Sequence, residues 1–457
     1  MLHPPRRSRR RRPGFSVPPP GRVARRPAPH ADRPRSGGGP GRRSAGDPMS
    51  LLDRARRLAL PSAAITAGIV VNATFTGMMG VLLPLLLAQR GVEKENIALF
   101  FVVNALTAAC LNLVVGRWLR KADAPRQGIA ASSLLAAAGL AVLAAPLPEW
   151  TIYPAGMAVM CMSLVFPQYV AIADSAKTGS SARTMGTVRT LFVSGYVLGL
   201  GVYSAAALLA EVEPTLRPVH TAMAIAALNA LLCLVPHRKP PVPEPAQADG
   251  ESGGHSSRPN PLRVIAVAIA VVLMLRAADS LRQVYLPLYA LATDVPEPAI
   301  SALFAVTTIV ELVVLVPLGI ISERFGSVRT LIAVCAFGAV SFTAVVLFGG
   351  LPALFGSQVV YAVFTAGFQS IAVVLLGDVL RSGISGGAGV YTAVVQAGSM
   401  IGFVAPLMVP GYQAEVFWIG VALCVAPAVL LALLPRLGFT GPAKAEEARV
   451  PGSGRAQ

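Results

Sequence analysis

Long apolar runs separated by short polar loops dominate the chain between residues 61 and 435. A helix needs ~20 predominantly apolar residues to cross a bilayer, and twelve runs are of about this length. They lie at 61–87, 97–116, 128–147, 151–173, 185–210, 219–236, 263–291, 299–321, 329–349, 351–377, 389–410 and 416–435. The pattern therefore predicts an all-α membrane protein with twelve transmembrane helices.

The loop at 237–262 is the one long loop between these runs, and it is polar and rich in Pro, Gly and Ser, as linkers are. It divides the runs into six and six. The prediction is an N-terminal six-helix bundle over 49–236, a cytoplasmic linker over 237–262, a C-terminal six-helix bundle over 263–436 and a cytoplasmic tail over 437–457.

Composition supports a membrane protein, because 54% of the residues are hydrophobic and 13% are charged, against ~25% charged in soluble domains. The net charge of +17 comes largely from residues 1–48, which hold thirteen Arg and two Asp. This segment has too few apolar residues to fold and is expected to be disordered. It either binds nucleic acid or anionic lipid or lies upstream of a true start at Met49, and the second interpretation is favoured. No nucleic-acid partner is therefore expected.

Lys and Arg residues are distributed unequally between the two sides of the predicted membrane. The loops and ends on one side carry seventeen of them, whereas the loops on the other side carry only Arg90, Lys94 and Arg217. By the positive-inside rule, both termini and the linker are expected to be cytoplasmic, in a multi-pass protein of the cell membrane.

The two sets of six runs repeat each other at an offset of 203 residues. The paired residues are Pro84 with Pro287, Ile97 with Ile300, Phe101 with Phe304, Gly116 with Gly319, Gly186 with Gly389, Gly195 with Gly398 and Gly199 with Gly402. Six crossings per half start both halves on the same side, so the repeat is parallel. A transporter built in this way has its binding site between the halves, near the midplane.

The seventh run contains Arg276, Asp279 and Arg282, three residues apart and therefore on one face of a helix. Glu311 lies near the middle of the eighth run. Ionised groups at this depth cost a few kcal/mol unless they are paired or wetted, so a polar cavity is expected beside them. We expect a four-member network in which Asp279 and Glu311 are the proton carriers, because protonation breaks the pairing of a carboxylate with Arg. The alternative is a purely structural network that fixes helix packing.

Neutral polar side chains also lie within the apolar runs. They are Asn72, Asn104, Gln168, Tyr196, Gln283, Tyr361, Gln369 and Gln396. Amides and phenols offer the donors and acceptors that a hydroxylated solute needs, although each one could equally make a hydrogen bond between helices. All of these except Tyr196 are predicted to bind substrate, together with Arg189, Arg276 and Arg282. Arg189 could instead extend toward the cytoplasmic face.

The loop GIISERFGSVR, from Gly319 to Arg329, resembles a signature of the major facilitator superfamily, which has this loop between its eighth and ninth helices. The resemblance implies the major facilitator fold, with two pseudo-symmetric six-helix bundles. It also implies gating roles for Gly319, Glu323 and Arg324, with Gly319 allowing two helices to approach closely. The first-half copy contributes Gly116 and Asp123 but has Arg120 where an acid is expected.

Further stretches resemble bacterial sugar efflux transporters of this superfamily. They are FVVNAL (101–106), RWLRKAD (117–123), VFPQYVAIAD (165–174), SARTMGTVRTLFVSGYVLGLG (181–201), TIVELVVLVPLG (308–319) and GDVLRSGISGGAGVYTAVVQAG (377–398). Gly186, Gly195 and Gly199 partly match the antiporter signature of exporters, with Leu200 where a proline is expected. The resemblance implies proton-linked export of sugars or sugar-like compounds.

Other chemistries find little support in the chain. The five cysteines lie in apolar runs without metal-ligand spacing, and there is no G-x-x-x-x-G-K phosphate-binding loop. We expect no enzymatic activity, no cofactor and no metal. The expected function is secondary active transport of a sugar-like small molecule by alternating access, with proton antiport, in a protein that is a monomer in the bilayer. The alternatives are export of drugs or metabolites and, from another class, a membrane sensor or scaffold.

Overall fold

The computed structural model describes residues 63–115, 125–175, 181–213, 215, 217–234, 260–380 and 383–439. The chain divides into two units, Met1–Ala55 and Arg56–Gln457, and every described residue belongs to the second. The predicted tail over 1–48, most of the predicted linker and the gating residues Gly116 and Asp123 lie outside the described residues.

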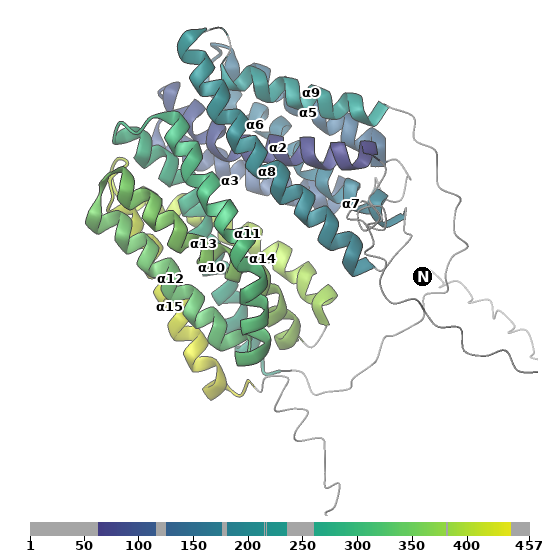
Figure 1. The fold of residues 1–457 in the computed structure, drawn as a ribbon. Coiled ribbons are helices and arrows are strands. Elements are labelled where there is room, and N and C mark those ends of the chain that lie inside the picture. The colour runs from purple at the N-terminus through teal and green to yellow at the C-terminus, as the bar shows by residue number, and fades with distance from the viewer. Residues whose placement is uncertain are drawn as a thin grey trace, which may run out of the picture. The chain divides into compact units, whose positions relative to one another are not determined.

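The first six crossings follow the predicted runs closely (Figure 1). Five of them are α2 (Ala63–Gln89), α3 (Lys94–Cys110) with a π-helical turn after it (Leu111–Val115), α5 (Pro125–Ala144), α8 (Ser181–Val212) and α9 (Pro218–Leu234). The fourth crossing, between α5 and α8, consists of a 3₁₀ turn (Glu149–Thr151), α6 (Ile152–Met160), a second 3₁₀ turn (Cys161–Leu164) and α7 (Val165–Ser175). The fourth crossing is therefore a helix interrupted by one 3₁₀ turn.

The last six crossings are mostly longer. They are α10 (Leu262–Ala292), α11 (Glu297–Phe325), α12 (Ser327–Phe348), α13 (Gly350–Leu380), α14 (Gly383–Val404), continued by a 3₁₀ turn (Ala405–Met408), and α15 (Val416–Leu433), continued by another (Leu434–Leu437). Gly326 separates α11 from α12 with a φ of 88°, which residues other than glycine rarely adopt.

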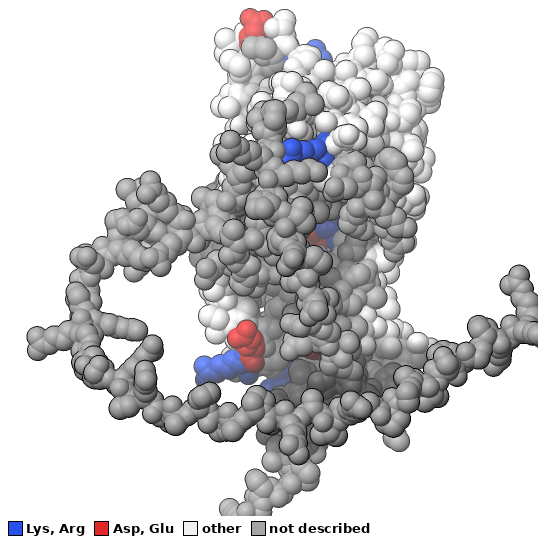
Figure 2. All heavy atoms as spheres, turned by 90° about the vertical axis from the view of Figure 1, so that its right-hand side faces the viewer, with Lys and Arg blue, Asp and Glu red and all other residues white. Residues whose placement is uncertain are grey.

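Ten of the described helices are long and apolar enough to cross a membrane, and the apolar stretches Pro218–Cys233 and Ala393–Met408 are shorter. The second of these belongs to α14, whose first turns are rich in Gly and therefore less apolar. Figure 2 shows one face of the molecule, where the described side chains are mainly uncharged and the Lys, Arg, Asp and Glu residues form a few small groups. The chain is an all-α, multi-pass membrane protein.

Helix packing has the symmetry that the sequence repeat predicts. In the first half α2 packs on α8, α5 on α9, and α5 on α6; in the last half the corresponding pairs α10 with α14, α12 with α15, and α12 with α13 pack in the same way. Between the halves, α8 packs on α11 and α3 on α14, while α2 meets α10. Because α14 is the counterpart of α8, α11 of α3 and α10 of α2, the contact of α8 with α11 is equivalent to that of α14 with α3, and α2 meets its own counterpart. A pseudo-twofold axis between two six-helix bundles requires these equivalences.

The paired glycines make equivalent contacts in the two halves. A Cβ on Gly199 would lie 2.1 Å from the carbonyl oxygen of Thr74, and one on Gly402 would lie 2.2 Å from that of Ala277. Thr74 and Ala277 are themselves 203 residues apart. The expected close approach of α8 to α2 and of α14 to α10 is therefore present, as in other membrane helix pairs with small residues at the interface.

Gly319 does not have the contact that the loop signature led us to expect. A Cβ on Gly319 would meet nothing within 4 Å, so none of the described helices packs closely there. The prediction of close approach at Gly319 is wrong, because this part of α11 presents an open face. Glu323 and Arg324, on the same turn, are exposed, and among the described residues Glu323 has no ion-pair partner.

These glycines give a matched prediction on stability. We expect Gly402→Ala to lower the free energy of unfolding by ~1–3 kcal/mol, because the added methyl group overlaps the backbone of α10. Gly319→Ala should be neutral or stabilising by up to ~1 kcal/mol, since alanine favours the helix. Thermal denaturation of the purified variants in detergent measures both effects. Equal stability of the two variants would contradict the packing described.

Candidate functional site

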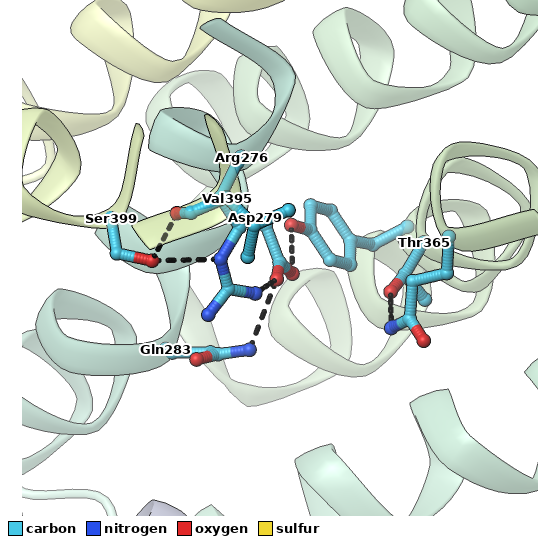
Figure 3. Close-up of polar contacts among 8 residues, drawn as sticks. Arg276, Asp279, Gln283, Thr365, Val395 and Ser399 are labelled. Atoms are coloured by element: carbon cyan, nitrogen blue, oxygen red, sulfur yellow. Dashed lines mark hydrogen bonds and ion pairs between the residues drawn. The ribbon is translucent and has the colours of Figure 1, made fainter. Parts of the chain in front are cut away.

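The centre of α10 carries an ion pair that is held from three sides (Figure 3). Asp279 is buried, and its Oδ2 lies 2.5 Å from Nη1 of Arg276 on the preceding turn. Gln283 donates to the same oxygen at 3.0 Å, and the hydroxyl of Tyr361 donates to Oδ1 at 3.0 Å. The Nε of Arg276 donates to Ser399 on α14 at 2.8 Å. Four hydrogen bonds, made by side chains of three helices, thus fix this pair, and three of them reach the carboxylate of Asp279.

Arg282 forms a second polar group one turn farther along α10. Its Nε donates to Gln358 at 2.7 Å and its Nη2 to Thr307 at 2.8 Å. Its guanidinium carbon lies 4.6 Å from the ring centre of Phe304 and 4.3 Å from that of Tyr361. Arg282 is therefore a buried cation that neutral polar groups and aromatic rings hold.

The predicted four-member network is divided in the structure. Asp279 pairs with Arg276 and not with Arg282, whose side chain turns toward α11 and α13. Glu311, at the middle of α11, makes no hydrogen bond or ion pair among the described residues. Tyr361 contacts both groups, because its hydroxyl reaches Asp279 and its ring covers Arg282. The reason for the division is that α13 inserts Tyr361 and Gln358 beside α10.

Glu311 nevertheless lies among charges from both halves. Asp279, Arg189 and Arg282 act electrostatically on its carboxyl group. Arg189 is exposed on α8, so the first half contributes a cation to the surroundings of a carboxyl group in the last half. Glu311 is half-buried, without a fixed partner, and close enough to three charges for its protonation state to matter.

The first half has no counterpart of this charged centre. At an offset of 203 residues, the positions of Arg276, Asp279, Arg282 and Glu311 correspond to Ala73, Thr76, Met79 and Ala108. The framework of the two halves repeats, but these four charged residues have uncharged residues at the equivalent positions of the first half. An asymmetric function is therefore built on a symmetric fold.

The first half instead carries buried amides without partners. Oδ1 of Asn72, Oε1 of Gln168 and both terminal atoms of Asn104 have no hydrogen-bond partner among the described residues. Asn229, on α9, shows the ordinary situation, since Tyr169 donates to it at 2.8 Å and it donates to Ser133 at 2.8 Å. Buried polar groups are normally paired, and a lost partner costs ~1–3 kcal/mol. The unpaired amide atoms are therefore candidates for hydrogen bonds to a solute.

The remaining predicted substrate residues lie at different degrees of burial. Gln283, Gln369 and Gln396 are half-buried, and Gln369 donates to Thr365 at 3.0 Å. Tyr361 is fully buried, which places it behind the charged centre and away from solvent.

Hydrogen bonds between the two halves gather at one end of the bundle, where α2 and α8 end and α3 and α11 begin; we call this the seam end. Lys94, the first residue of α3, is buried there, and its ammonium group donates to three carbonyl oxygens of the last half. The acceptors are Pro406 at 2.9 Å, Val409 at 2.5 Å and Gly411 at 2.6 Å. One side chain of the first half is thus enclosed by the backbone of the last half.

Glu297, the first residue of α11, makes the second connection at the seam end. Tyr203 donates to its Oε2 at 2.8 Å, and Gln89 donates to its Oε1. The Ser301 hydroxyl, one turn farther, donates to the carbonyl oxygen of Leu200 at 2.6 Å. Gln89, Tyr203 and Glu297 also line a cavity of about 1160 Å³ that opens at this end. The two halves must lose all these bonds to separate here.

We expect Lys94→Ala to favour separation of the halves at the seam end, because it removes three bonds that cross between them. The measurement is the rate at which a membrane-impermeant maleimide labels Ser301→Cys, a fully buried position, after the five native cysteines have been replaced. Labelling should become several-fold faster. Arg90→Ala is the control, because Arg90 donates to Leu143 and Leu147 within its own half. Equal rates in the two variants would contradict this role of Lys94.

Reasoning from the sequence missed several residues of the site. Gln358 and Thr307 hold Arg282, and Ser399 holds Arg276. Gln358 could have been found, since it is an amide in an apolar run like those that were selected. Lys94 was counted only as a loop charge, and nothing in its sequence neighbourhood indicates the carbonyl groups that surround it.

Comparison with known proteins agrees with this architecture. The sequence profile of the Major Facilitator Superfamily matches residues 65–291. No curated protein sequence matches the chain. Among solved structures, the chain is similar to the nucleoside transporter NupG, at a TM-score of 0.65 and 12% identity, over 82% of this chain and 99% of the other.

Two further solved structures have the same fold. The peptide transporter POT, in complex with sulfate, is similar at a TM-score of 0.62 and 14% identity, over 82% of this chain and 94% of that one. A bacterial homolog of the human lysosomal transporter Spinster, in an inward-facing and unoccupied conformation, is similar at 0.57 and 12% identity, over 84% and 96%. At such identities the likeness concerns the fold alone.

Proposed function

Since the chain is a secondary transporter of the Major Facilitator Superfamily, and not an enzyme, we propose that it exports sugar-like solutes across the bacterial cell membrane in exchange for protons. The unequal distribution of Lys and Arg supports cytoplasmic termini, with the seam end at the outer surface. The division of the chain into bundles over 49–236 and 263–436, joined by a cytoplasmic linker, is part of this proposal.

The observation that carries the solute class is the set of unpaired amides in the first half. Asn72, Asn104 and Gln168 offer donors and acceptors without charge, as a neutral hydroxylated molecule requires. A large apolar drug would leave these groups unpaired and is therefore disfavoured. The resemblance to sugar efflux transporters agrees with this choice.

The charged centre of the last half supports coupling to protons. Glu311 and Asp279 can each take up a proton, and Arg189, Arg276 and Arg282 are the cations that respond to the change of charge. In an antiporter, the proton and the solute must occupy the protein in turn. Alternating access would follow from rocking of one half against the other, with the Lys94 and Glu297 bonds breaking each time the outer end opens.

Transport by everted membrane vesicles tests this proposal. A proton gradient imposed on vesicles that contain the protein should drive accumulation of sugars in preference to nucleosides, peptides or hydrophobic drugs. Collapse of the gradient with an uncoupler should release the accumulated solute. Accumulation of drugs but not sugars would contradict the proposed solute class. Uptake that does not depend on the proton gradient would contradict proton coupling.

A further inference from the structure

The side chain of Lys94 is held at the seam end by groups that suit a cation. The three N–H donors of its ammonium group match the three backbone carbonyl oxygens that accept from it. Two aromatic ring centres lie 5.5 and 5.7 Å from Nζ, within the range of cation–π attraction. Among the described residues no carboxylate pairs with Lys94, although a buried lysine usually has such a partner. We call the groups around the ammonium the cation cage; they are the carbonyl oxygens of Pro406, Val409 and Gly411 and the rings of Tyr285 and Tyr412.

The last half builds the cation cage from its own contacts. A 3₁₀ turn (Ala405–Met408) follows α14 directly and fixes the first of the carbonyl groups. Gly411, which supplies the last one, has a φ of 64°, a left-handed conformation that turns the chain. The hydroxyl of Tyr285 donates to the backbone of α14 at 2.8 Å, which fixes its ring, and the hydroxyl of Tyr412 is buried without a partner among the described residues. None of these contacts involves Lys94, so the cage should persist when Lys94 withdraws.

The sequence repeat indicates that the cage is specific for positive charge. At the offset of 203 residues, Lys94 corresponds to Glu297, and Tyr203 corresponds to Pro406. The bond from Lys94 to Pro406 is therefore the counterpart of the bond from Tyr203 to Glu297. In the second bond the first half supplies donors to an anion, with Gln89 as the other donor, whereas in the first bond the last half supplies acceptors to a cation. The repeat thus sets the position of both contacts, and the acceptors of the cation cage set the charge.

We propose that the cation cage is a binding site for primary ammonium ions, which Lys94 fills while the seam end is closed and vacates when it opens. This inference rests on the proposed alternating access, in which the bonds of Lys94 break. A free primary ammonium ion carries the same three donors as the lysine side chain. It binds the open form only, because Lys94 occupies the cage in the closed form. Such an ion therefore shifts the equilibrium toward the open form and opposes closure.

Lys94→Ala tests the site directly, because it empties the cage. The ion n-propylammonium supplies the side-chain atoms beyond Cβ that the substitution removes. A ligand of the folded protein raises the Tm, so this ion should raise the Tm of purified Lys94→Ala by ~2–4 °C at neutral pH. Tetramethylammonium at the same concentration has no N–H donors and should cause no such rise. Arg90→Ala is the matched control variant, since Arg90 also donates to two carbonyl oxygens, and its Tm should respond equally to the two ions.

A second measurement keeps Lys94 in place. The cysteine-free protein with Ser301→Cys is labelled with the impermeant maleimide in the presence of either ion. The rate should rise several-fold with n-propylammonium, because the ion holds the seam end open and exposes this buried position, and it should not rise with tetramethylammonium. An unchanged Tm of Lys94→Ala, or a labelling rate that the two ions affect equally, would overturn the inference. If both results are as expected while vesicles show no uptake driven by protons, the proposed antiport fails and the cation site stands.

Discussion

Replacement of Glu311 by Gln should abolish transport driven by a proton gradient while exchange of solute across the membrane continues. The substitution keeps the size of the side chain and removes its ability to carry a proton. Because Glu311 has no hydrogen-bond partner among the described residues, folding should be spared. The measurement compares accumulation of labelled sugar under an imposed proton gradient with counterflow at equal pH on both sides. Accumulation should fall to background, and counterflow should remain.

Glu323→Gln provides the control on the same helix. Glu323 is exposed three turns farther along α11 and has no ion pair among the described residues. Its replacement also removes one negative charge, but at a position away from the charged centre. Both activities should therefore persist in Glu323→Gln. Full accumulation by Glu311→Gln would remove Glu311 from the coupling step.

Asn104→Leu should stabilise the protein and impair solute binding at the same time. Both terminal atoms of the Asn104 amide are buried without partners, so the folded state gains ~1 kcal/mol or more when an apolar side chain replaces them. If a hydroxyl of the solute normally completes these bonds, its loss raises the KM for transport about tenfold. Thermal denaturation without solute and the concentration dependence of transport measure the two effects.

Asn229→Leu is the control, because it shows whether replacing any buried amide by leucine has the effects expected for Asn104→Leu. Asn229 is fully buried like Asn104, but its amide is bonded to Tyr169 and Ser133. Leucine at this position leaves both partners unpaired, so stability should fall by ~1–3 kcal/mol. If Asn104→Leu also lowered stability and left KM unchanged, Asn104 would be a structural residue.

The fold was predictable from the chain because two strong signals agree. Apolar runs of ~20 residues dictate helices, since a helix is the element in which a single segment satisfies its own backbone in lipid. The offset of 203 residues relates Gly199 to Gly402 and also the backbone atoms that each one contacts, so one sequence register describes both halves. The interruption of the fourth crossing near Cys161 was not predicted, because a 3₁₀ turn leaves the apolar pattern unchanged.

The site was less predictable, because the side chains that bond to one another depend on how each helix is rotated about its axis as well as on their depth in the membrane. Sequence spacing placed Arg276, Asp279 and Arg282 on one face, but it could not indicate that Tyr361 from α13 would lie between them. The open surroundings of Gly319 and the carbonyl groups around Lys94 are likewise set by neighbours that are distant in sequence. Charges inside apolar runs locate a site, whereas the pairing within it follows from the packing of the whole bundle.

The central claim is that carboxyl groups of the last half exchange protons against a solute held by both halves. Its most direct test is the simultaneous recording of proton and sugar movement in proteoliposomes that contain the purified protein, with a sugar gradient and no initial pH gradient. The proposal predicts that protons move opposite to the sugar, and that Glu311→Gln eliminates the proton movement. Sugar movement without protons, or protons that move in the same direction as the sugar, would contradict it.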